Sequence, residues 1–159
     1  MALEEGVNSY VSLADADGYM ADRANSQAWV DASDADKEQS LVTASRTLNA
    51  MSWEGITVSV SQTLAFPRSG QYFDPLHGQF IQFVEDEIPS RVKEAVVEMA
   101  YHFLVNTDVL DEGSSIDDIK VGPIELKGLS KVSSTPPTVY RLVAPFRKNG
   151  GAALWWRVN

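Results

Sequence analysis

IPSRVKEAVVEMAYHFLVN (88–106) carries the clearest helical pattern in this chain. Pro89 suits the first position of a helix, where the missing amide hydrogen has no bond to make. The apolar side chains behind it recur at intervals of three and four residues, so a helix would place them on one face. They are Val92, Ala95, Val96, Met99, Ala100 and Phe103. We therefore expect residues 88–106 to form the central helix of the core.

Two more helices are expected on the N-terminal side of this one. SLADADGYMADRA (12–24) and SDADKEQSLVTASRTLNAM (33–51) each open with a serine followed three residues later by an aspartate, which is a signal of a capped helix N-terminus. In the second segment, apolar and small residues also follow helical spacing. On the C-terminal side, SSTPPTVYRLVAPFRK (133–148) predicts a short fourth helix, because Thr135 suits a cap and Pro136 suits the first turn.

Extended structure is expected between the helices. ITVSV (56–60) alternates apolar and polar residues, which fits a short half-buried strand or an extended arm. LAFPRSGQYFDPLHG (64–78) is rich in proline and glycine, and it predicts a long loop. We expect most aromatics in and near it, Phe66, Tyr72, Phe73 and Phe80, to pack on the helices, with a contact role as the alternative. After an acidic linker at 108–118, IKVGPIELKG (119–128) contains two alternating segments around a Gly-Pro pair, which predict a hairpin or a strand pair.

The predicted fold class is therefore mainly α. We expect a small helical bundle, with three core helices plus a short C-terminal helix, a small β-hairpin or extended loop, and a C-terminal arm. A chain of 159 residues suits one hydrophobic core. We expect residues 1–134 to form the helical core with the projecting loop and the β element, and residues 135–159 to form the C-terminal helix and a docking tail.

Charge is distributed unevenly along the chain. The formal net charge is −9, yet every acidic residue lies before residue 135, and residues 135–159 carry four cations. An acidic body disfavours bulk DNA binding, because most of its surface would repel phosphates. The basic terminal segment could instead attract an acidic protein partner. No apolar run is long enough for a membrane span and the N-terminus lacks a signal-peptide pattern, so we expect an aqueous, cytosolic setting.

Sequence motifs for catalysis are missing. The chain lacks G-x-S-x-G, a phosphate-binding loop and G-x-G-x-x-G, and it has no cysteine. Glu98 and His102 are spaced to share a helix face, but one such pair is more often a surface contact than a metal site. The acidic clusters at 15–18 and 31–36 fit helix caps better than calcium loops. We expect no enzymatic activity, no cofactor and no metal ion, although an unrecognised pair of catalytic carboxylates stays open.

Four segments together resemble a known family. They are NSYVSLADADGYMADR (8–23), the 33–51 segment followed by Trp53 and Gly55, LAFPRSG (64–70) and IPSRVKEAVVEMAYHFL (88–104). In this order and spacing they resemble the small head–tail adaptor, or head-completion, proteins of tailed bacteriophages. Some families of such proteins carry a DnaT-like single-stranded-DNA-binding label. The resemblance covers residues 8–106.

This resemblance implies a structural role in the neck of a virion. Adaptors of this kind assemble as a ring, commonly dodecameric, beneath the portal. The ring extends the DNA channel and provides the platform for the stopper and tail proteins. A C-terminal helix or tail grips the portal, and a projecting loop or strand meets the next ring. The resemblance thus implies that packaged DNA passes through without specific binding and that assembly takes place in the host cytoplasm.

The terminal stretch GGAALWWRVN (150–159) fits this role. A leucine and two tryptophans behind a glycine pair would expose a large apolar area unless a partner covered it, and Trp and Arg are common interface anchors. We expect residues 135–159 to contact the portal or a neighbouring subunit, although the tryptophans could instead fold back on their own domain. The predicted interface residues are Tyr140, Arg141, Phe146, Arg147, Lys148, Leu154, Trp155, Trp156 and Arg157. The acidic residues predicted for the channel lumen or rim, where they would repel the duplex, are Asp111, Glu112, Asp117 and Asp118.

A second function stays open from the sequence. Trp155, Trp156 and Arg157 are residue types on which the bases of single-stranded nucleic acid stack, so the protein could be a nucleic-acid-binding accessory protein. Proteins of that class combine stacking with a positive groove. In this sequence, we expect only residues 135–159 to offer such a groove.

Overall fold

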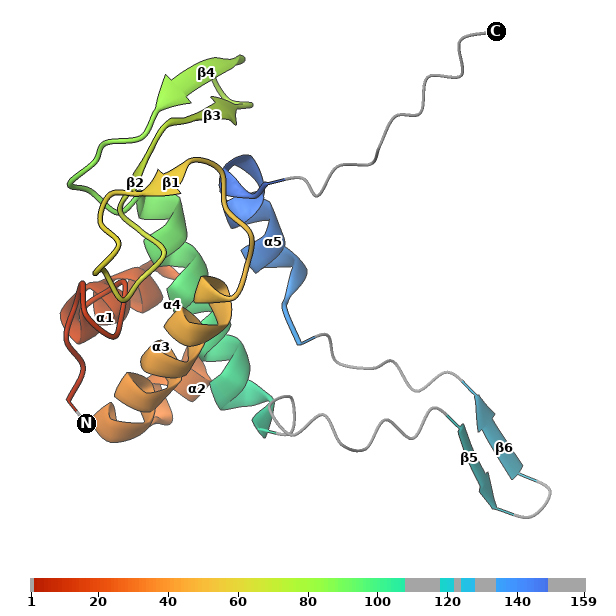
Figure 1. The fold of residues 1–159 in the computed structure, drawn as a ribbon. Helices are drawn as coiled ribbons and strands as arrows, with labels where there is room; N and C mark the ends of the chain where they lie inside the picture. Colours follow the sequence, from red (N-terminus) through yellow and green to blue (C-terminus); the bar gives the residue numbers. More distant parts are fainter. Residues whose placement is uncertain (1, 108–117, 122–123, 128–133, 149–159) are drawn as a thin grey trace, which may run out of the picture.

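The computed structural model describes residues 2–107, 118–121, 124–127 and 134–148 (Figure 1). The chain folds as a mainly α protein with small antiparallel strand pairs, as the sequence predicts. The helices are α1 (Leu13–Asp22), α2 (Gln27–Asp31), α3 (Asp34–Asn49), α4 (Ser90–Val105) and α5 (Pro137–Val143), and α5 continues into a 3-10 turn, η2 (Ala144–Phe146). The strands are β1 (Ile56–Thr57), β2 (Arg68–Ser69), β3 (Gln71–Asp74), β4 (Gln79–Gln82), β5 (Asp118–Val121) and β6 (Ile124–Lys127).

Helix α4 lies at the centre of the fold. It contacts α1, α2, α3 and α5, and in Figure 1 it runs through the middle of the helical body. All six apolar residues on the face predicted for this helix are buried. The prediction that residues 88–106 form the central helix is therefore confirmed, with the observed helix beginning at Ser90.

The predicted helix caps are also present. Ser12 Oγ accepts a hydrogen bond from the Asp15 amide (3.1 Å), and Ser33 Oγ accepts one from the Asp36 amide (3.2 Å). Each cap satisfies an amide at the start of its helix that has no partner within the helix. Asp15, Asp34 and Asp36 therefore lie in the first turns of α1 and α3, as predicted, whereas Asp31 of the second acidic cluster is the last residue of α2.

Helix α2 was not predicted. Its five residues are too few to show a helical period, so the segment between the first two predicted helices reads as a connector. In the fold, α2 buries Trp29, which is 2% exposed, and the indole Nε1 donates to Asp17 Oδ1 of α1 (2.7 Å). A buried indole with a satisfied N–H anchors this short helix to the bundle.

The strands form three antiparallel pairs. β5 pairs with β6, which confirms the strand pair predicted at 119–128. The segment predicted as a long loop instead contains β2 and β3, and β3 pairs with β4 in a hairpin. The stretch 56–60 contributes only the two residues of β1, and its apolar side chains are exposed rather than half-buried.

The proline-rich loop is held in place by Arg68. Its guanidinium donates to the backbone carbonyls of Glu54 (2.6 Å), Gly55 (2.7 Å) and Ala65 (3.0 Å). The neighbouring Phe66 is 1% exposed, and its ring meets those of Tyr10, Trp53, Phe83 and Phe146 edge-on. One cation and one aromatic ring therefore tie this irregular segment to the body.

The described part of the C-terminal segment also belongs to this body. Helix α5 packs against α4, and Val139, Val143 and Phe146 are buried in the same core as the preceding helices. Phe146, predicted as a partner contact, is 2% exposed and packs against Phe66, Tyr72 and Phe83. A side chain already covered by its own domain cannot be covered by a partner, so the structure assigns Phe146 to the core.

Candidate functional site

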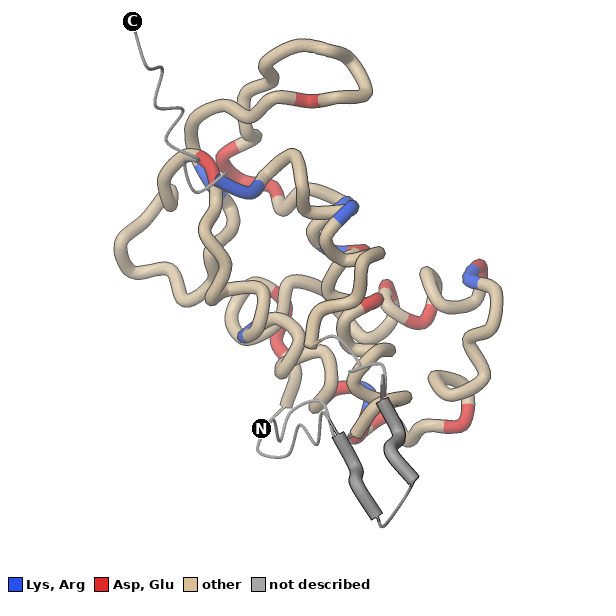
Figure 2. The backbone as a smooth tube through the Cα atoms, turned by 90° about the vertical axis from the view of Figure 1, so that its right-hand side faces the viewer, with Lys and Arg blue, Asp and Glu red and all other residues tan. Residues whose placement is uncertain are grey.

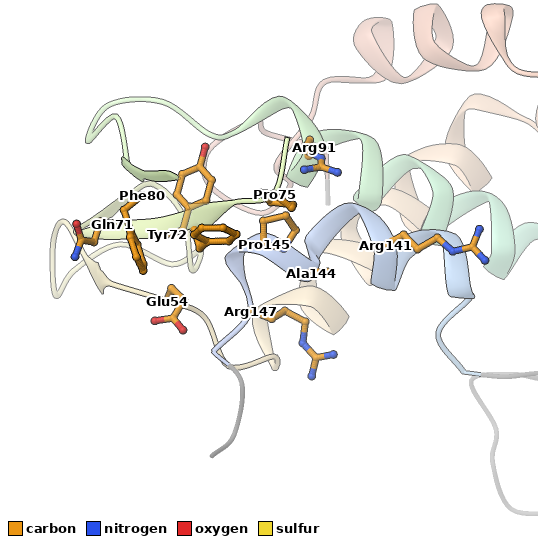
Figure 3. A pocket seen from close by; sticks show the side chains of 11 residues that line it. Glu54, Gln71, Tyr72, Pro75, Phe80, Arg91, Arg141, Ala144, Pro145 and Arg147 are labelled. Carbon is orange, nitrogen blue, oxygen red and sulfur yellow. The ribbon is translucent and has the colours of Figure 1, made fainter. Parts of the chain in front are cut away.

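A groove lies between the β3–β4 hairpin, the start of α4 and the α5–η2 turn (Figure 3). Its volume is about 480 Å³. We call it the arginine groove. Its lining residues are Glu54, Gln71, Tyr72, Phe73, Pro75, Phe80, Arg91, Arg141, Ala144, Pro145 and Arg147.

Backbone hydrogen bonds fix the position of this groove. The Glu54 amide donates to the Phe146 carbonyl (2.8 Å), and the Lys148 amide donates to the Ser52 carbonyl (3.1 Å). Trp53 forms an antiparallel bridge with Arg147 between these two bonds. The segment after α5 is thereby paired with the segment after α3, which brings Arg147 and Glu54 to the same groove.

Three cations and one carboxylate give the arginine groove a positive balance. Arg91 comes from the first turn of α4, Arg141 from α5, and Arg147 from the residue after η2. None of the three forms an ion pair with another residue that the structure describes. In Figure 3 their guanidinium groups point in different directions around Ala144 and Pro145. This arrangement suits an extended anionic chain better than a single small anion.

Arg147 keeps unused hydrogen-bonding capacity. Its guanidinium lies 5.3 Å from the ring centre of Tyr140, a cation–π contact. Its Nε is buried and has no hydrogen-bond partner among the described residues. A buried donor without a partner is costly, so an acceptor from a bound molecule would be favoured here.

The aromatic side of the groove has a buried and an exposed part. Tyr72 packs on Phe83 and Phe146, with ring centres 4.9 and 4.7 Å away. Phe73 and Phe80 lie opposite each other on the hairpin, 5.5 Å apart, and are 48% and 66% exposed. We expect most aromatics of this stretch to pack on the body, and Phe66 and Tyr72 do so. The hairpin carries Phe73 and Phe80 away from the bundle instead, which leaves them free for the contact role that the sequence allows.

Exposed apolar side chains are concentrated in the same part of the chain. Seven of the eleven large apolar side chains that are exposed within the described residues belong to residues 56–84. We call this the 56–84 surface. Its exposed members are Ile56, Val58, Val60, Phe73, Leu76, Phe80 and Val84. Phe73 and Phe80 contact each other across the hairpin, and exposed large apolar side chains in mutual contact are typical of a surface that another molecule covers.

The turn of the hairpin contains an acid–histidine pair. Asp74 Oδ2 lies 2.5 Å from His77 Nδ1, and Asp74 Oδ1 accepts a hydrogen bond from the Leu76 amide (2.9 Å). The hydrogen bond with His77 is the main cause that holds the pKa of Asp74 below its ordinary value, and the Leu76 amide adds to it. This carboxylate therefore organises the turn of the hairpin, which carries the exposed Leu76.

The predicted interface residues fall into different groups in the structure: some line the arginine groove, some are exposed, and some lie outside the described residues. Arg141 and Arg147 line the arginine groove, Tyr140 is 42% exposed, and Lys148 is exposed. The predicted residues that lie outside the described part of the chain are Leu154, Trp155, Trp156, Arg157, Asp111, Glu112 and Asp117, and Asp118 is the first residue of β5.

Sequence reasoning missed the contribution of α4 to a positive groove. Only residues 135–159 were expected to offer one, but Arg91 joins Arg141 and Arg147 because α5 packs along α4. The sequence carries no signal for this meeting, since the residues lie some fifty positions apart. In contrast, the aromatics of the 64–78 segment were visible in the sequence, and only their exposure was not.

Glu98, one of the candidates from the sequence, has a structural contact. Glu98 is buried and binds Arg23 of the α1 C-terminus rather than lying on the surface. Within the described ranges, no group of three or more His, Asp or Glu side chains is placed to hold a metal ion. The part of the chain that the structure describes also contains no helix long and apolar enough to cross a membrane.

Acidic positions recur along several separate segments of the backbone (Figure 2).

Comparison with known families gives one match. Residues 2–157 match the family described as "Putative DnaT-like ssDNA binding protein". The comparisons with curated proteins and with solved structures gave no match. Because the match spans nearly the whole chain, the chain belongs to this DnaT-like family.

Proposed function

We propose that the protein is a structural adaptor in the neck of a tailed bacteriophage. In this role it forms a ring that attaches to the portal, extends the DNA channel and carries the stopper or tail proteins. The proposal rests on the resemblance of residues 8–106 to head–tail adaptors and on one structural observation. That observation is the concentration of exposed apolar side chains on the 56–84 surface.

The 56–84 surface supports assembly for a physical reason. The hairpin projects from the helical body, and the core beneath it is already filled by Tyr72, Phe83 and Phe146. Further folding of the described body would therefore not bury Phe73, Leu76 or Phe80. A neighbouring subunit or ring would cover them and gain the hydrophobic free energy, about 25 cal/mol for each Å² of apolar area removed from water.

The acidity of the chain is consistent with this role. A channel that lets DNA slide should not hold its phosphates, and a net charge of −9 opposes phosphate binding over most of the surface. The acidic residues predicted for the lumen or rim stay a prediction.

The test is the mass of the protein in solution with and without the portal. Sedimentation should reveal a ring of full-length protein, alone or on the portal. Leu76→Ser and Phe80→Ser should reduce assembly, because each places a polar group where apolar contact is needed. Val30→Ser is the matched control, since Val30 is 65% exposed but lies on α2, away from the 56–84 surface. A protein that stays monomeric at high concentration and does not bind the portal would contradict the proposal.

A second candidate function is binding of single-stranded DNA. The arginine groove favours DNA binding, because its lining combines three arginines with the exposed rings of Phe73 and Phe80. Proteins that bind single strands combine such a positive groove with aromatic rings on which bases stack. The family description also names this activity.

Fluorescence anisotropy with a labelled oligonucleotide across a salt series separates the two functions. Tight binding that weakens steeply with salt, with a smaller slope for Arg91→Ala and Arg141→Ala, would support DNA binding. Ring formation without oligonucleotide binding would support the adaptor.

A further inference from the structure

A second groove lies at the other end of α4. It is formed by α2, the N-terminal half of α3 and the end of α4, and its volume is about 500 Å³. We call it the acidic groove. Its lining residues are Ala28, Asp31, Ala32, Asp36, Gln39, Ser40, Thr43, Phe103, Leu104 and Thr107.

The two grooves carry opposite charge. The acidic groove is lined by two carboxylates and no cation, whereas the arginine groove is lined by three arginines and one carboxylate. Hydrogen bonds hold both carboxylates in place: Gln27 Nε2 donates to Asp31 Oδ1 (2.8 Å), and Ser33 Oγ donates to Asp36 Oδ2 (2.7 Å). Lys37, which follows Asp36 in the sequence, is already paired with Asp17 and Asp34. Phe103, Leu104 and two alanines add apolar atoms to the lining. The remaining lining residues are polar and uncharged: Gln39, Ser40, Thr43 and Thr107.

We propose that the acidic groove binds residues 149–159 of a second copy of this chain. This segment contains Leu154, Trp155, Trp156 and Arg157 and no acidic residue. Its apolar side chains match the apolar lining, and its arginine matches the carboxylates at Asp31 and Asp36. The arginine groove would instead repel Arg157. This inference rests on the proposed ring and names the contact that would join its subunits.

The position of the last described residue favours a second copy over the same chain. Lys148 is bonded to Ser52, just beyond the C-terminal end of α3, whereas the acidic groove lies along the N-terminal half of α3. The residues from Asp36 to Asn49 span about 20 Å of helix. The seven residues from Lys148 to Trp155 reach about 24 Å only when fully extended. The chain's own tail would therefore have to turn back and lie in a largely extended form along α3, whereas a second copy can present its tail without that constraint.

This arrangement gives a head-to-tail contact. The last described residue before the segment, Lys148, lies just beyond the C-terminal end of α3, and the groove lies along its N-terminal half. Such a heterologous contact repeats from copy to copy, and it forms a closed ring when the rotation between subunits closes. The acidic groove therefore supplies the geometry that the proposed assembly requires.

The absence of cysteine from the sequence allows a direct test. Two single-cysteine versions of the full chain, Gln39→Cys in the acidic groove and Ala153→Cys in the tail, are mixed and oxidised. Disulfide-linked dimers should form at least about tenfold faster than with Gln71→Cys, the matched control in the arginine groove. Equal rates at Gln39 and Gln71, or no cross-link at either, would overturn the inference.

Two further variants sharpen the result. Asp31→Lys should slow cross-linking about tenfold, and Arg157→Glu on the tail should restore it, because the pair of charges is exchanged. Lysine at the C-terminal end of α2 suits the helix dipole, so this change does not oppose folding. In a chain that carries both cysteines, a disulfide that forms within one molecule at low concentration and never between molecules would overturn the second-copy assignment.

The mass measurement separates this inference from the proposed function. Rings that form without a Gln39–Ala153 cross-link would leave the adaptor proposal standing and overturn this contact. A cross-link between copies that never close into rings would support the contact and contradict the ring.

Discussion

The guanidinium of Arg23 binds the carboxylate of Glu98 through two hydrogen bonds, from Nε at 2.8 Å and from Nη2 at 3.1 Å. Tyr19 adds a third bond to the same carboxylate (3.0 Å). The side chain of Glu98 is only 9% exposed, and it lies on the central helix. The C-terminal end of α1 is thereby fixed to α4 by a paired charge rather than by apolar contact alone.

Replacing Arg23 with methionine should lower the free energy of unfolding by about 2–3 kcal/mol, because Glu98 would keep a buried charge without its partner. The partial exposure of Arg23 limits the loss, since water screens the pair. Urea unfolding measures the change. Lys93→Met is the matched control: it breaks the more exposed pair with Glu5 and should cost less than about 1 kcal/mol. Equal losses in the two variants would contradict this view of Glu98.

Tyr10 should make stability fall at alkaline pH. Burial is the main cause that raises the pKa of Tyr10 to about 12, from an ordinary value of 10.0. Because the folded state holds the proton more tightly, this contribution is fully present below pH 10 and is lost as the pH rises to about 12. The loss should be on the order of 2–3 kcal/mol. The free energy of unfolding, measured from pH 8 to 12, should decline less in Tyr10→Phe than in the unchanged protein. An equal decline in the two proteins would contradict this role of Tyr10.

Asp74 should make the hairpin sensitive to acid. Its pKa is lowered in the folded protein, first by the bond with His77, so its contribution is present above the ordinary carboxylate range and is lost as the pH falls through the lowered value. The amide signals of the hairpin should therefore shift on acidification below about pH 4. Asp74→Asn should weaken the turn at neutral pH and remove this transition. If the amide signals still shift on acidification in Asp74→Asn, another carboxylate causes the shift.

Alanine substitutions at Phe146 and Tyr140 should differ in their effect on stability, because the first side chain lies in the core and the second at the surface. Phe146→Ala should destabilise the fold by about 3–5 kcal/mol, because it opens a cavity next to Phe66 and Tyr72. Tyr140→Ala should cost about 1 kcal/mol or less, since that side chain is 42% exposed and its contact with Arg147 is a cation–π interaction near the surface. Thermal unfolding of both variants gives the comparison. Similar losses would mean that Tyr140 is packed more tightly than its exposure indicates.

Local signals account for the parts of the fold that the sequence predicts. The apolar spacing of 88–106 and the serines at 12 and 33 depend on residues within one or two helical turns of each other, so the pattern is complete within one segment. Helix α2 and the β3–β4 hairpin are too short to show a period, and tertiary contacts of Trp29 and Tyr72 stabilise them.

Long-range partners account for what the sequence does not predict. The sequence pairs Glu98 with His102 because the two are four residues apart, but its partner Arg23 lies 75 residues away. Arg91 and Arg141 meet for the same kind of reason, through the packing of α5 on α4. Charge totals along the chain correctly indicate an acidic protein, yet they do not reveal that cations gather at one end of α4 and carboxylates near the other.

Helix α4 contributes Arg91 to one groove and Leu104 to the other, and it runs between them without a break. Its sixteen residues act as a stiff strut about 24 Å long. One continuous helix therefore holds the two grooves at a fixed spacing, and molecules bound in both of them would keep that spacing as well.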